Sequence, residues 1–113
     1  MIINQGYYYD SMIDVAAADM TEGQFKTVNN INGFTMGNYS TGESYSLVYK
    51  CNKAKAAKDS TVLINRGQTV YYNITNKNIT GVAGSNVKVG VALETKAIGT
   101  TEILIYFDGT LGV

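Results

Sequence analysis

The side chains that could carry out acid–base or nucleophilic chemistry are few and scattered. The chain has no histidine and a single cysteine, Cys51. Without a histidine to activate it, Cys51 is a weak candidate nucleophile, and we interpret it as a buried structural residue. Paired carboxylates could hydrolyse glycosides, but no spacing singles out a pair among Asp10, Asp14, Asp19, Glu22, Glu43, Glu94, Glu102 and Asp108. The sequence therefore predicts a protein that is not an enzyme.

The sequence also lacks the common motifs that bind metals and nucleotides. The pattern Asp-x-Asx-x-Asx-Gly of calcium loops does not occur. No glycine-rich loop ends in Gly-Lys-Ser/Thr, so the sequence has no phosphate-binding loop. We expect neither a metal nor a cofactor.

Length and charge limit the class of protein. A chain of 113 residues suits one domain with a modest core. Its formal net charge is zero, which predicts no nucleic-acid partner and no attraction to an acidic membrane. No targeting segment and no apolar run of membrane-spanning length is apparent. A lone cysteine excludes an intrachain disulfide and favours assembly in a reducing cytoplasm.

Strand and turn residues dominate the chain. Short segments rich in β-branched and aromatic residues predict strands at 25–28, 45–49, 61–64, 69–72, 87–89, 91–93 and 102–107. Turns are predicted between them at Glu22-Gly23, Asn32-Gly33, Thr41-Gly42, Arg66-Gly67, Gly84-Ser85-Asn86, Ile98-Gly99 and Asp108-Gly109. Short strands at close spacing predict an all-β fold, a small barrel or sandwich.

One segment, residues 52–58, has helix-forming residues but is too short for a stable helix. We expect a single turn or a loop there. Its three lysines, Lys53, Lys55 and Lys58, form a local basic spot. The spot is either a solvated linker or a contact for an acidic partner surface.

The first fifteen residues differ from the rest. Three consecutive tyrosines, Tyr7, Tyr8 and Tyr9, stand between Gly6 and Asp10 without a clear periodicity. We expect residues 1–15 to form an N-terminal arm that adds to a neighbour's sheet edge or packs on a partner, and residues 16–113 to form a single β domain. The alternative is an ordinary first strand of that domain.

The order of glycines and strands repeats within the chain. A Gly-Gln pair precedes a strand at Gly23 and again at Gly67. Later in each half, a glycine opens a segment and a second glycine precedes the closing strand, and the spacing from Gly33 to Gly42 equals that from Gly90 to Gly99. This pattern predicts two related β units, with an insertion at residues 73–86 of the second.

The same landmarks resemble a known family. They are an alanine-rich approach to a Gly-Gln turn at residues 16–24, then segments at 33–36, 41–43, 66–72, 86–94, 97–99 and 103–106. The chain from Ala16 onwards is similar to the small decoration, or cement, proteins of tailed-phage capsids, most closely at residues 89–94 with the turn at Gly99. The family's genes often carry a recombinase label. Gln68 departs from that family's usual Asp, and the tyrosine-rich N-terminus has no counterpart in it.

The resemblance implies a virion protein that is made in the host bacterial cytoplasm and binds the capsid exterior. Its partner would be the major capsid protein, it would bridge capsomers, and it would sit there as a homo-oligomer, a trimer. Candidate contacts are the arm around Tyr7, Tyr8 and Tyr9 and the lysine spot. Two alternatives stay open: a carbohydrate- or cell-surface-binding β module that uses exposed tyrosines, and a tail or fibre component.

Overall fold

The computed structural model describes residues 2–3 and 9–112 and is built from strands alone. The described residues contain no helix, and hence none that could cross a membrane. The strands are β1 (Ile2–Ile3), β2 (Tyr9–Val15), β3 (Phe25–Val28), β4 (Ile31–Thr35), β5 (Ser44–Ala57), β6 (Thr69–Asn73), β7 (Asn78–Thr80), β8 (Val87–Ala92) and β9 (Glu102–Asp108). The predicted all-β class is confirmed.

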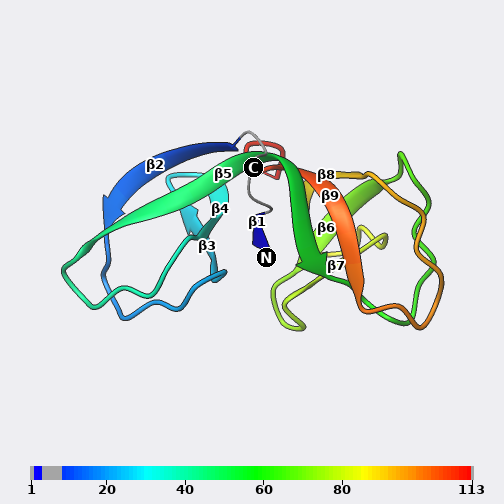
Figure 1. The fold of residues 1–113 in the computed structure, drawn as a ribbon, viewed down its shortest axis with the longest axis horizontal. Coiled ribbons are helices and arrows are strands. Elements are labelled where there is room, and N and C mark those ends of the chain that lie inside the picture. The colour runs from blue at the N-terminus through cyan, green and yellow to red at the C-terminus, as the bar shows by residue number, and fades with distance from the viewer. Residues whose placement is uncertain (1, 4–8, 113) are drawn as a thin grey trace.

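A single curled sheet joins all nine strands, and β5 is its central member. The sheet runs in the order β3-β4-β5-β9-β8-β6-β7, and both β1 and β2 also pair with β5. Figure 1 shows why β5 can take so many partners: it arches across the whole molecule, with β2, β3 and β4 at one end and β6 to β9 at the other. Its register with β9 shifts between Cys51 and Ala54, and on its other edge β2 gives way to β1 at the same point.

The two ends of the molecule are copies of one unit. Unit 1 comprises β2, β3, β4 and the first half of β5; unit 2 comprises the second half of β5, β6, β8 and β9. Met20 and Tyr39 exchange two backbone hydrogen bonds in unit 1, as Ile64 and Lys96 do in unit 2. The matched glycines Gly23, Gly67, Gly42 and Gly99 all have positive φ. These backbone hydrogen bonds and turns confirm the predicted internal repeat.

The two units share a core. Its larger cluster centres on β5, β8 and β9 and includes Phe34 of unit 1, whose ring meets the edge of Phe107 with centroids 5.2 Å apart. A smaller cluster around Tyr45 and Leu47 belongs to unit 1 alone. Because Phe34 is buried against unit 2, we expect the two ends to fold as one domain rather than as two.

The expected turn at Asn32-Gly33 is wrong, because these residues lie inside β4. The chain reverses three residues earlier, at Asn29 and Asn30. Both have positive φ, and they form the two-residue loop of the hairpin that joins β3 to β4. Gly33 serves close packing instead of a turn. A Cβ at this position would collide with the carbonyl oxygen of Val48.

The segment at residues 52–58, expected to form a turn or a loop, is mostly the second half of β5. Pairing with β9 and burial of Ala54 and Ala56 stabilise the extended conformation. These interactions outweigh the local preference for a helix. The strand expected at residues 61–64 is also wrong. That segment is a loop in which Ile64 alone makes a β-bridge, to Lys96.

Candidate interaction surface

The three lysines of the predicted basic spot have different environments. Lys53 and Lys55 are exposed on β5, and the Lys55 ammonium lies 3.2 Å from the Glu102 carboxylate. Lys58 is only 3 % exposed. Its ammonium donates hydrogen bonds to the backbone carbonyls of Asp59 at 2.8 Å, Val62 at 2.6 Å and Ala97 at 3.3 Å. The exposed part of the spot is therefore Lys53 and Lys55, in a region where Glu102 supplies the opposite charge.

The tyrosine cluster is described only at its last member. Tyr7 and Tyr8 lie outside the described residues. Tyr9 is exposed and begins β2, opposite Cys51 of β5. The structure thus gives the described part of the predicted arm a place along β5 of the same chain. Whether residues 1–15 act as an arm in an assembly stays a prediction.

Strand β2 carries an apolar stripe that faces outward. Its burial alternates, so that Tyr9, Ser11, Ile13 and Val15 point away from the core. Ile13 is 76 % exposed and Val15 is 58 % exposed. Within the described residues β2 pairs with β5 and with no other strand, so it lies at an edge of the sheet. An exposed strand edge beside an apolar stripe is typical of surfaces that bind other proteins.

The sequence predicts no facing for residues 9–15, because the segment has no clear periodicity. The structure places Asp14 on the inner face, because the Tyr45 hydroxyl donates to its carboxylate over 3.4 Å. Burial, with Asp14 nearby, raises the pKa of Tyr45. Met12, on the same face, packs on the smaller cluster. The inner face of β2 thus carries Met12 and Asp14, which contact the smaller cluster and Tyr45 of β5.

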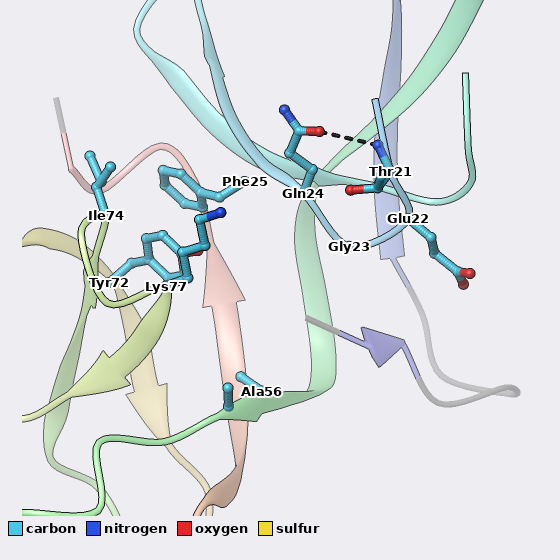
Figure 2. Close-up of a pocket in the computed structure, with 10 residues that line it drawn as sticks. Thr21, Glu22, Gly23, Gln24, Phe25, Ala56, Tyr72, Ile74 and Lys77 are labelled. Carbon is cyan, nitrogen blue, oxygen red and sulfur yellow. Dashed lines mark hydrogen bonds between the residues drawn. The ribbon is translucent and has the colours of Figure 1, made fainter. Parts of the chain in front are cut away.

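A cleft of about 450 Å³ lies between the two units (Figure 2). The turn that leads into β3 forms one wall, with the Gln24 side-chain oxygen accepting a hydrogen bond from the Thr21 amide. Phe25 from this wall stacks on Tyr72 from unit 2, with ring centroids 4.2 Å apart. Burial raises the pKa of Tyr72. Each ring therefore covers one face of the other in the wall of the cleft.

The described residues contain no metal-binding cluster, and their one cysteine is buried. No group of three His, Cys, Asp or Glu side chains in this part of the chain could hold a metal ion. Cys51 is fully buried, its thiol donates to the Lys53 carbonyl, and burial raises its pKa, which disfavours the reactive thiolate.

Comparison with known proteins gives one match. A family model described as phage cement protein matches residues 9–107, nearly all of the described chain. No curated protein matches, and no solved structure matches.

Proposed function

We propose that this chain, which belongs to the phage cement protein family, binds the outer surface of a tailed-phage capsid. There it would bridge adjacent capsomers. Membership assigns the chain a structural, capsid-stabilising role in the virion. The exterior location, the major capsid protein as partner and synthesis in the host cytoplasm are the finer parts of the proposal. The observation that carries it is the match over residues 9–107.

The architecture supports bridging because it joins two similar units rigidly at a fixed separation. The molecule extends 41 Å along its longest axis, and β5 runs through both units without a break. The shared core around Phe34 and Phe107 opposes bending between the units. A clamp needs such stiffness, because a flexible joint would let capsomers separate before the contacts resisted.

Weak contacts would suffice for this role. A cement protein binds a shell that repeats the same sites many times, and two linked contacts raise each other's effective concentration. The outward stripe of β2 is the candidate contact in unit 1, together with Tyr9, and Lys53 and Lys55 are candidates on β5. The formal net charge of zero suits a partner other than nucleic acid.

The test is binding of the purified protein to capsids of its own phage that lack it. We expect saturable co-sedimentation, and we expect the decorated capsids to survive heating that opens bare ones. Absence of binding under conditions where the protein stays folded would overturn the proposal.

A trimeric arrangement on the shell is part of the proposal. Strand β2 lies at an edge of the sheet and carries the outward apolar stripe, which offers a surface through which copies meet. Mass measurement of the free protein across a concentration series tests whether the trimer forms before docking. Decorated capsids would carry it in groups of three, and isolated single copies on the shell would contradict it.

A further inference from the structure

The internal duplication provides a comparison between the outer tips of the two units. Each tip consists of two loops that a β-bridge joins, Met20 to Tyr39 in unit 1 and Ile64 to Lys96 in unit 2. A glycine amide closes each tip: Gly42 donates to the Ala16 carbonyl, and Gly99 donates to the Ser60 carbonyl. Figure 1 shows the two tips at opposite ends of the long axis. Their backbones are equivalent, so differences between their side chains are informative.

Several matched positions differ between the tips, and at two of them a polar side chain of unit 1 corresponds to an exposed aliphatic one of unit 2. In unit 1 these two positions hold Asp19, before Met20, and Thr41, before Gly42. Both the amide and the hydroxyl of Thr41 donate to the Asp19 carboxylate, at 2.9 Å and 3.0 Å. In unit 2 the same positions hold Leu63, before Ile64, and Ile98, before Gly99. The unit 1 tip is a hydrogen-bonded polar pair, whereas the unit 2 tip is an aliphatic pair.

The aliphatic pair is exposed to solvent. Leu63 is 48 % exposed and Ile98 is 68 % exposed. The polar pair of unit 1 shows that this loop framework does not require aliphatic side chains at these positions. Folding therefore gives no reason for Leu63 and Ile98 to be apolar, while docking does.

The loops beneath this pair are held firmly. The buried Lys58 ammonium joins both loops, because it donates to carbonyls of Asp59 and Val62 in one and of Ala97 in the other. The Asp59 carboxylate accepts from the amide and the hydroxyl of Thr61, at 2.9 Å and 2.6 Å. A contact fixed in this way loses little entropy on binding. Lys58 is thus a positioning residue rather than a contact.

We propose that the unit 2 tip, through Leu63 and Ile98, is an anchor that inserts into an apolar depression on the outer surface of the capsid shell. This proposal rests on the proposed function. Two aliphatic side chains cover far less than the roughly 800 Å² per partner of a stable complex. A second free copy would therefore not be held by them, whereas a shell that presents the same depression many times would be.

The experiment transplants the unit 1 chemistry onto unit 2. The variant L63D/I98T places the polar pair in the matched framework, and I74T/V82T is the control, since Ile74 and Val82 are also exposed aliphatic residues of unit 2. Binding to capsids that lack the protein is measured by co-sedimentation for wild type and both variants. The unfolding midpoint of each variant shows whether it is folded. If the midpoint of L63D/I98T is below that of wild type, the uncharged variant L63T/I98T is used in its place.

We expect L63D/I98T to bind at least about tenfold more weakly, because burial of an aliphatic side chain changes affinity by about this factor or more. The control should bind like wild type. If wild type binds and L63D/I98T binds equally well, the anchor is overturned while the cement role stands. If wild type itself does not bind, the proposed function fails. A change in the oligomeric state of free L63D/I98T would identify a second copy as the occupant and overturn the anchor too.

Discussion

Lys55 and Lys58 are close in the chain but differ in what they contribute to stability. Lys55 makes an ion pair with Glu102 in which both side chains are exposed, so K55M should lower the free energy of unfolding by less than about 1 kcal/mol. The buried Lys58 ammonium donates to the backbone carbonyls of Asp59, Val62 and Ala97, and K58M removes all three hydrogen bonds. We expect K58M to cost about 3 kcal/mol in urea unfolding. Equal effects of the two substitutions would contradict the buried role of Lys58.

Gly33 and Gly90 occupy matched positions in the two units, and both lack room for a side chain. A Cβ on Gly90 would collide with the Tyr106 carbonyl of β9. We expect G90A to destabilise the protein by about 3 kcal/mol or more, because backbone must move. Gly42 has positive φ but open space around it, so G42A should cost about 1 kcal/mol. Thermal unfolding of both variants measures this. A larger drop in unfolding temperature for G42A than for G90A would contradict the steric explanation.

The acid dependence of stability is set in part at Asp59. Hydrogen bonds from the Thr61 side chain and amide hold the pKa of Asp59 below its ordinary value of 3.8. The unfolded chain then takes up the proton first, so this contribution is present at neutral pH and is lost as the pH falls below about 4. We expect D59N to be less stable at pH 7 and to lose less on acidification. Urea unfolding at pH 7 and pH 3 measures this, and parallel losses would argue against it.

Among the elements, β2 separates folding from docking most clearly. Its outward Ile13 and Val15 make no contribution to the buried clusters, whereas Leu47 of β5, beneath β2, is fully buried. We expect I13S/V15S to leave the unfolding midpoint nearly unchanged and to weaken capsid binding. L47A, in contrast, should cost about 2 to 5 kcal/mol. Unchanged capsid binding by I13S/V15S would remove the stripe from the proposed contact surface.

The sequence was sufficient for elements whose signals are local. The sequence predicts strands such as β3 and β9, the glycine turns and the internal repeat, because runs of β-branched residues and turn glycines can be recognised from residue type alone. The strand at residues 52–58 was not predicted, since its extended form depends on β9, which lies far along the chain. The exposed Ile13 and Val15 were missed for the same reason, because the facing of β2 depends on its pairing with β5 and on the packing of Met12. Leu63 and Ile98 became candidates only once the two tips could be compared.

On the scale of the whole molecule, duplication produces a rigid body with two unlike ends. Unit 1 presents the β2 stripe and a polar tip, and unit 2 presents the aliphatic tip. One strand and one shared core hold the units together. This arrangement is what the proposed bridging of two neighbouring capsomers requires.

The most direct test of bridging is a cryo-electron microscopy map of capsids decorated with the protein. The account predicts that each copy contacts two capsomers, with unit 1 on one and the Leu63–Ile98 tip on the other. Density showing every copy seated within a single capsomer, with the unit 2 tip in solvent, would contradict it.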